Sequence, residues 1–230
     1  MKIRSGLLVF TLVCSLAIIG LTILKLDNSI ERQLELAILD GYPGTTKADV
    51  GLKINWLKDG VQGNIASLTV KIYDWRHESL QINIFQGDFI NVQINWLQLF
   101  RKKQIIVEKI GQGNILAAID ETNLNKMINR YYRGLSINLE ENGMKVNLNV
   151  KILDYTIRAI VHGTLIPGTG PALYFVPEKI DIGKYELSEN IRQDLFKKMK
   201  IPLSLEKIPF TFQVTTVKIM QNKIIIEGKV

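Results

Sequence analysis

The chain contains few of the residues on which catalysis and metal binding depend. Among its 230 residues there are one cysteine, Cys14, and two histidines, His77 and His162. A single cysteine cannot form a disulfide within the chain, and because Cys14 lies inside an apolar run, the sequence beyond that run has no thiol chemistry. Neither histidine has a partner at metal-ligand spacing, and HExxH and paired-cysteine motifs are absent. The sequence predicts no metal and no cofactor.

The serine and carboxylate motifs of enzymes are missing as well. No serine lies in a GxSxG nucleophile elbow. The adjacent acids at 140–141 and 120–121 fall at an expected turn and an expected helix start, where acidic residues are common without any chemistry. The glycine-rich stretches 111–114 and 167–171 lie between expected strands, with no lysine-bearing helix start after them, so we interpret them as turns. We expect no enzyme activity.

Acidic residues are fewer than basic ones, and the net charge is +7. Lys2, Arg4 and Lys25 supply three of these charges within residues 1–25, which hold no acid, so the rest of the chain carries +4. This weak positive balance suits an anionic lipid surface and lacks the basic, aromatic-rich patch of a nucleic-acid binder. The basic run at 101–103 is expected to be a solvated turn.

Charge is also absent from residues 6–24, an apolar run of 19 residues. At ~1.5 Å per residue this run would extend roughly 28 Å as a helix, close to the thickness of a bilayer core. Lys2 and Arg4 precede it, which favours a cytoplasmic start and an extracytoplasmic remainder. A cleaved signal peptide is the alternative, but no small-x-small cleavage site follows the run. We predict that residues 1–25 form an uncleaved, single-pass anchor in the cell membrane.

The segment 26–44 has the pattern of an amphipathic helix. Asp27 or Asn28 can cap its start, and Gly41 with Pro43 can end it. Its apolar residues at helical spacing are Ile30, Leu34, Ala37 and Ile38. The helix can pack this stripe on the following domain, or it can lie along the membrane as a juxtamembrane stalk.

Residues 45–230 are expected to form one domain with many antiparallel strands. Apolar residues alternate with polar ones in 66–72, 80–84, 90–96 and 144–165, with the last stretch forming two strands that turn near 153–154. The final stretch predicts a hairpin that turns at 221–222, with a bulge near 215–216 where the alternation slips.

Two helices are expected within this domain. One spans 120–132, with Asp120 or Thr122 as its cap, and the other spans 188–200 from Ser188. No internal repeat or low-complexity linker is present. The predicted fold class is α+β, and two short helices are too few to cover the apolar faces of roughly nine strands. Either the sheet closes on itself with a dry core, or a partner covers it, or acyl chains fill the space.

The C-terminal half has the order helix, strand pair, proline-bearing strand, helix and final strand. Distinctive positions in this order are Leu124 and Asn125 in the first helix, Pro177, Pro202, Pro209 and Gly228. With this order and these residues, the C-terminal half resembles the LmeA-like phospholipid-binding family of bacterial envelope proteins.

This resemblance implies a tubular lipid-binding (TULIP-like) fold, in which a long, strongly curved antiparallel sheet wraps one or two helices. It implies a carrier, chaperone or sensor of membrane phospholipid or another envelope lipid. The expected groove residues are Leu124, Met127, Ile128, Tyr131, Val146, Leu148, Val150, Tyr155 and Ile157. The expected headgroup contacts are Lys126, Arg130 and Arg133. The alternative is a non-catalytic scaffold domain with a dry core that docks a cell-envelope complex.

Overall fold

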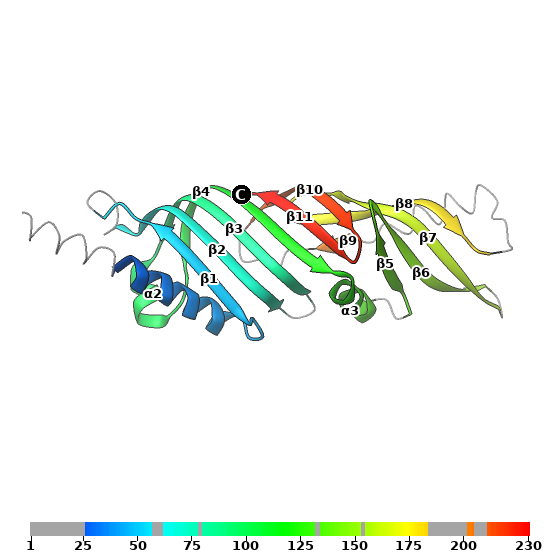
Figure 1. Cartoon of the computed structure of the whole chain (residues 1–230), viewed down its shortest axis with the longest axis horizontal. Coiled ribbons are helices and arrows are strands. Elements are labelled where there is room, and N and C mark those ends of the chain that lie inside the picture. The colour runs from blue at the N-terminus through cyan, green and yellow to red at the C-terminus, as the bar shows by residue number, and fades with distance from the viewer. Residues whose placement is uncertain are drawn as a thin grey trace, which may run out of the picture.

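The computed structural model describes residues 26–56, 62–77, 80–131, 134–152, 155–183, 202–204 and 211–230. Over these ranges the protein is α+β, mostly antiparallel sheet with few helices, as predicted, and its strands form two open sheets (Figure 1). The expected anchor at 1–25 and the expected helix at 188–200 lie outside the described residues. Within the described ranges, no helix is both long and apolar enough to cross a bilayer.

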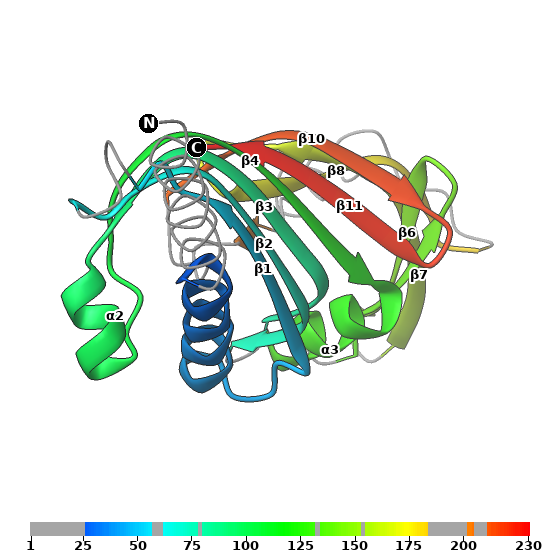
Figure 2. The same ribbon diagram turned by 60° about the vertical axis from the view of Figure 1, so that its left-hand side comes forward.

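Two sheets replace the single long sheet that the sequence suggested. The six-stranded sheet has the order β1 (Lys47–Lys53), β2 (Asn64–His77), β3 (Leu80–Ile94), β4 (Val107–Asp120), β11 (Lys223–Lys229), β10 (Gln213–Met220). The five-stranded sheet has the order β5 (Ser136–Glu140), β6 (Gly143–Ile152), β7 (Tyr155–Pro167), β8 (Ala172–Asp181), β9 (Pro202–Ser204). Figure 2 shows the six-stranded sheet arching over a helix at residues 26–41 and over α2 (Trp96–Lys102).

The long β2–β3 hairpin departs from strict two-residue alternation, and in this way it keeps its apolar side chains on the inner face. The buried cross-strand pairs are Ile65–Val92, Leu68–Phe89, Ile72–Phe85 and Trp75–Ile82. Two of the three steps between these pairs span three residues, and these steps coincide with left-handed φ angles of 52° at Asp74 and 55° at Asn91. The prediction of strict alternation was therefore wrong here: Ile90 is 51% exposed. The predicted separate strands at 80–84 and 90–96 are one continuous strand, β3, which ends at Ile94, and Trp96 begins helix α2 instead.

The helix at 26–41 packs its apolar stripe on the domain, which was one of the two open interpretations. Ile30, Leu34, Ala37 and Ile38 are all buried, and the helix ends at Gly41, both as predicted. Asp27 and Asn28 lie inside this helix, so the predicted cap is wrong. The Asp27 carboxylate instead accepts a hydrogen bond from the Trp56 indole at 2.7 Å.

The same helix protects the edge strand β1. Glu31 accepts a hydrogen bond from the Leu52 amide at 2.9 Å, and Glu35 accepts one from the Val50 amide at 3.4 Å. Edge strands present unpaired amides that promote aggregation unless they are covered. Two carboxylates one helical turn apart therefore cover this edge.

Helix α3 (Glu121–Tyr131) begins as predicted at Asp120, whose carboxylate accepts from the Asn123 amide at 2.7 Å. Asn83 on β3 donates to the other Asp120 oxygen at 2.7 Å and accepts from the Asp120 amide at 2.9 Å. The start of α3 is thus fixed to the six-stranded sheet, and Thr122 does not serve as the cap.

Helix α3 also covers β5, the edge of the five-stranded sheet. Asn125 accepts from the Ile137 amide and donates to the Ile137 carbonyl, both at 2.7 Å. Glu121 accepts from the Leu139 amide at 2.6 Å. The Asn125 side chain pairs with the edge as another strand would, so α3 joins the two sheets.

The C-terminal hairpin β10–β11 confirms two predictions. It turns at 221–222, and its register shifts between Val214 and Thr216. The predicted pair within 144–165 is also confirmed as β6 and β7, which are paired from Met144–Gly163 to Ile152–Tyr155. Residues 153–154 between them lie outside the described part.

Helix α2 was not predicted. It follows Asn95, whose side chain accepts from the Gln98 amide at 3.1 Å, and it ends at Lys103, which has a left-handed φ of 53°. The basic run 101–103 is therefore the last turn and cap of a helix, where positive charge is favoured, and not a simple turn.

Candidate functional site

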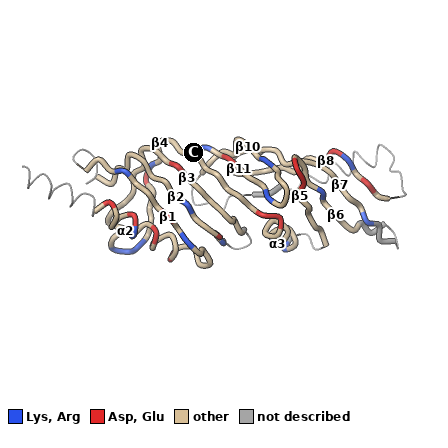
Figure 3. The backbone as a smooth tube through the Cα atoms, viewed as in Figure 1, with Lys and Arg blue, Asp and Glu red and all other residues tan. Residues whose placement is uncertain are grey.

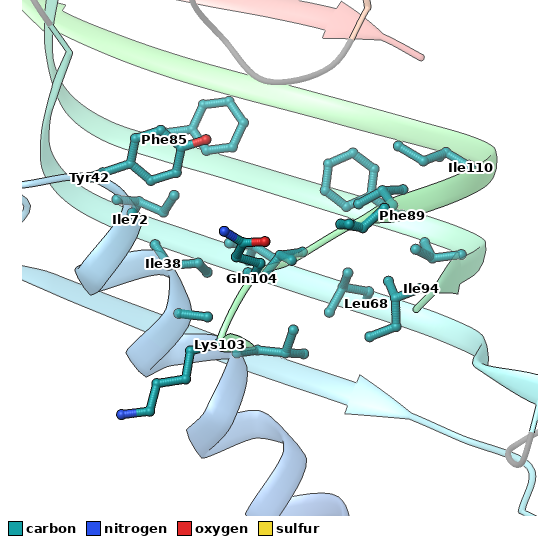
Figure 4. Close-up of a pocket in the computed structure, with 18 of the residues that line it drawn as sticks. Ile38, Tyr42, Leu68, Ile72, Phe85, Phe89, Ile94, Lys103, Gln104 and Ile110 are labelled. Atoms are coloured by element: carbon teal, nitrogen blue, oxygen red, sulfur yellow. The ribbon is translucent and has the colours of Figure 1, made fainter. Parts of the chain in front are cut away.

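A cavity of about 520 Å³ lies beneath the arch of the six-stranded sheet (Figure 4). The helix at 26–41 forms one wall, β2 and β3 form the floor, and residues 103–107 with the start of β4 form the opposite wall. Its lining residues are Leu34, Ala37, Ile38, Gly41, Tyr42, Leu68, Val70, Ile72, Trp75, Phe85, Phe89, Val92, Ile94, Lys103, Gln104, Ile105, Ile106, Val107 and Ile110. We call this cavity the apolar pocket.

Two glycines make room for an aromatic ring on the pocket floor. A Cβ atom at Gly87 or at Gly113 would lie 2.4 Å from the ring of Phe89, closer than side chains can approach. The ring therefore lies against the sheet where the glycines leave it space. Side chains at these positions would displace Phe89, which lines the pocket. The depth of the pocket thus depends on small residues in the sheet.

One end of the pocket is closed by three aromatic rings. Trp75 is 2% exposed and contacts Tyr42 edge-on, with ring centroids 5.3 Å apart, and Phe85 at 5.6 Å. Among the described residues, none accepts a hydrogen bond from the buried Trp75 indole nitrogen. Burial raises the pKa of the Tyr42 phenol, because the charged form loses its hydration. This end of the pocket is a dry aromatic surface.

The other side of the pocket reaches the protein surface. We define the pocket rim as the exposed lining residues Gly41, Lys103, Gln104, Ile106 and Val107. In Figure 4 the Lys103 side chain points away from the apolar cluster. Among the lining residues that the structure describes, Lys103 and Tyr42 are titratable, and none is a carboxylate, histidine or cysteine. These walls can bind an apolar chain.

Of the predicted groove and headgroup residues, those whose side chains the structure describes do not line this pocket. Leu124, Met127 and Ile128 of α3 and Val146 of β6 are buried, and Leu148 packs partly buried beside them. Helix α3 packs on β5, β3 and β4 and not chiefly on the predicted strand pair, and these residues belong to the protein core without lining the pocket.

The predicted headgroup residues Lys126 and Arg130 are exposed on α3. The side chains of Tyr131, Val150, Tyr155 and Ile157, together with Arg133, lie outside the part of the chain that the structure describes. The predicted groove beside α3 thus stays a prediction.

Sequence reasoning missed the pocket because its walls are far apart in the chain. The stripe of the helix at 26–41 was found, but nothing in the sequence pairs it with 103–107. One available signal was overlooked: Asn95 followed three residues later by Gln98 is typical of a helix start. Had α2 been predicted there, residues 103–107 would have been expected to follow a helix that packs on the domain.

No family model matches the chain, and neither a curated protein nor a solved structure is similar to it. The function must therefore be argued from the residues and their geometry.

Proposed function

We propose that the protein is a membrane-anchored, extracytoplasmic domain that binds an acyl chain of a phospholipid or another envelope lipid in the apolar pocket. The observation that carries the proposal is the cavity of about 520 Å³, which is walled almost entirely by aliphatic and aromatic side chains and reaches the surface at its rim. Pockets of this size, about 300–1,000 Å³, are typical of small-ligand sites.

The energetics of burial favour an acyl chain as the occupant. A buried methylene contributes ~0.8 kcal/mol, so about a dozen would contribute on the order of 10 kcal/mol before the chain loses its freedom. The lining offers few polar groups to recognise a sugar, a nucleotide or a peptide backbone. Affinity here would come from apolar area and not from hydrogen bonds.

Two further features agree with this proposal. The curved six-stranded sheet with helices beneath it is the arrangement that the TULIP-like resemblance implies (Figure 2). The apolar run 6–24 would anchor the domain in the cell membrane with its single pass, and Leu26, the first described residue, lies in the helix that forms a pocket wall. A lipid-binding site next to the bilayer would act as carrier, chaperone or sensor.

The test is photo-crosslinking of the full chain in vesicles. The probe is a phospholipid with a diazirine near the end of one acyl chain, and the adducts are mapped by peptide mass spectrometry. We expect adducts on β2, β3 and residues 103–110, in addition to those on 6–24. Gly41→Trp should reduce the pocket adducts severalfold, because a side chain at Gly41 meets open space within the lining.

Gly51→Trp is the matched control. Gly51 also has open space around its Cβ position, but it lies exposed on β1 and away from the lining, so its adducts should equal those of the wild type. Adducts confined to residues 6–24 in a folded protein would contradict lipid binding. That result would favour the scaffold domain with a dry core.

A further inference from the structure

Exposed apolar side chains are concentrated around α2. Of the ten large hydrophobic residues exposed within the described ranges, four belong to one short segment: Leu97 at 56%, Phe100 at 51%, Ile106 at 42% and Val107 at 41%. Leu97 and Phe100 are separated by three residues on α2 and share one helical face. Apolar residues scattered singly over a surface need no explanation, whereas a cluster indicates a contact.

The same segment carries a cluster of positive charge. Arg101, Lys102 and Lys103 are all exposed, and Arg101 lies on the helical face of Leu97 (Figure 3). Glu108, which accepts a hydrogen bond from Asn95, is the acid of this segment. Aromatic and aliphatic side chains beside several cations are typical of segments that insert into the surface of an anionic bilayer.

This surface is held in place by the fold. Leu99, on the opposite side of α2, is 1% exposed and anchors the helix in the core. Asn95 caps the start of α2, and at its end the Lys103 amide donates to the Leu99 carbonyl at 3.0 Å and the Gln104 amide to the Gln98 carbonyl at 3.3 Å. The exposure of Leu97 and Phe100 is therefore built into a capped helix.

The position of α2 also points to the membrane. In Figure 1, α2 and the first turn of the helix at 26–41 lie at the same end of the protein. Leu26 there is 41% exposed and is separated by one residue from the run 6–24 that we predict to span the bilayer. Lys103, Ile106 and Val107 belong both to this surface and to the pocket rim.

We infer that Leu97, Phe100, Ile106 and Val107, together with the cations at 101–103, form a docking surface for an anionic lipid bilayer. The docking surface goes beyond the proposed function, because it can bind a bilayer whether or not the pocket holds a chain. Docking places the pocket rim against the membrane, so that an acyl chain passes between bilayer and pocket without crossing water.

The test places an environment-sensitive fluorophore on α2 of the full chain. Cys14→Ser removes the native thiol, and Leu97→Cys accepts the apolar label. The protein is reconstituted in vesicles of phosphatidylcholine or of equal parts phosphatidylcholine and phosphatidylglycerol. We expect blue-shifted emission and protection from a water-soluble quencher only in the anionic vesicles. The same label at Met220→Cys, an exposed position on β10, should stay accessible in both.

Variants then separate charge from apolar contact. Each cation near an anionic surface changes partitioning about fivefold, so Arg101→Gln with Lys102→Gln and Lys103→Gln should lower the docking equilibrium about 100-fold. The charge-matched control, Lys218→Gln with Lys223→Gln and Lys229→Gln on β10–β11, should dock as the wild type does. The comparison of the two vesicle types uses neither variant, so it stands even if the α2 variant fails to fold.

Three results would overturn the docking surface. They are a label that stays exposed on anionic vesicles, shielding that is equal on neutral vesicles, and shielding that depends on protein concentration in detergent, which would assign this surface to a second copy of the chain. The two proposals fail separately. A docked α2 with no lipid adducts in the pocket contradicts only lipid binding, whereas pocket adducts with an exposed Leu97 label contradict only docking.

Discussion

The two sheets are each covered by a helix, but with different results. The helix at 26–41 and α3 both bind the amides of an edge strand through side chains, Glu31 and Glu35 in one case and Glu121 and Asn125 in the other. Beneath the first helix there is a cavity of about 520 Å³, whereas the apolar residues of α3 are buried in the core.

The difference follows from the size of the side chains that face each other. The first helix lines the pocket with Leu34 and Ile38, but Ala37 and Gly41 beside them are small, and Gly87 and Gly113 let the Phe89 ring lie against the sheet opposite. The apolar residues that α3 buries are all large: Leu124, Met127 and Ile128. Small residues on both walls leave space, and large residues fill it. Edge protection and pocket formation are therefore independent properties of a covering helix.

The largest expected effect comes from making the same change in both helices. Leu124→Ala should lower the free energy of unfolding by about 4 kcal/mol, because Leu124 is 0% exposed and the change leaves an enclosed cavity. Leu34→Ala should cost about 2 kcal/mol, since Leu34 borders a pocket that is already open. Urea unfolding of the full chain in mild detergent, followed by tryptophan fluorescence, measures both. Equal costs would contradict the comparison.

The second prediction concerns the edge of the five-stranded sheet. Asn125→Ala leaves the Ile137 amide and carbonyl without their partner and should cost about 2 kcal/mol. Hydrogen exchange at the Ile137 amide should become faster. Asn129→Ala is the control, because Asn129 is exposed on the same helix and alanine favours helix. If both variants lose equal stability, the edge pairing is not the cause.

The third prediction tests the pocket floor. Gly113→Ala places a Cβ atom 2.4 Å from the Phe89 ring and should cost about 1–3 kcal/mol through overpacking. It should also reduce lipid adducts, because the ring must move. Gly51→Ala has open space and should be neutral or stabilise by about 0.5 kcal/mol. A Gly113→Ala protein as stable as the wild type would show that the ring does not need this space.

The smallest effect is a dependence on alkaline pH. Burial raises the pKa of Tyr42 in the folded protein, so near pH 10 an unfolded tyrosine ionises while the folded one keeps its proton. This contribution to stability is complete below the unfolded pKa and is lost as the pH rises through the folded one. Tyr42→Phe should therefore lose less stability than the wild type between about pH 9 and 11. Parallel pH profiles of the two proteins would contradict this assignment.

Sequence patterns predicted the elements whose structure depends on neighbouring residues in the chain, such as alternating strands and a capped helix. The strands β6 and β7 alternate between apolar and polar residues with few exceptions, and Asp120 caps α3 in the ordinary way. The hairpin β2–β3 was misread because Asp74 and Asn91 adopt left-handed φ angles, which change the side-chain period. Asp and Asn adopt such angles more readily than most residues, but the sequence does not show which of the many Asp and Asn residues of the chain will do so.

The candidate site was harder to predict than the fold. The groove was expected beside α3 because the helix and the strand pair are close in sequence. The pocket instead joins Ile38, Phe89 and Ile106, which three separate segments contribute. A pocket is the space that packed segments leave between them. The periodicity of one segment predicts which of its own side chains are buried, but not the space between segments. The apolar excess was visible from the sequence, but its location was not.

The strand order also constrains how the protein can be made. Strands β1 to β4 are synthesised first, and β4 stays an unpaired edge of their sheet until β11 pairs with it. Asp120 on β4 meets its partner only when Lys223 on β11 has been made. A nascent chain therefore carries an open β-edge while the roughly 100 residues between 120 and 223 are made. A chain cut short before residue 213 would keep that edge permanently, and it should be prone to proteolysis and to aggregation.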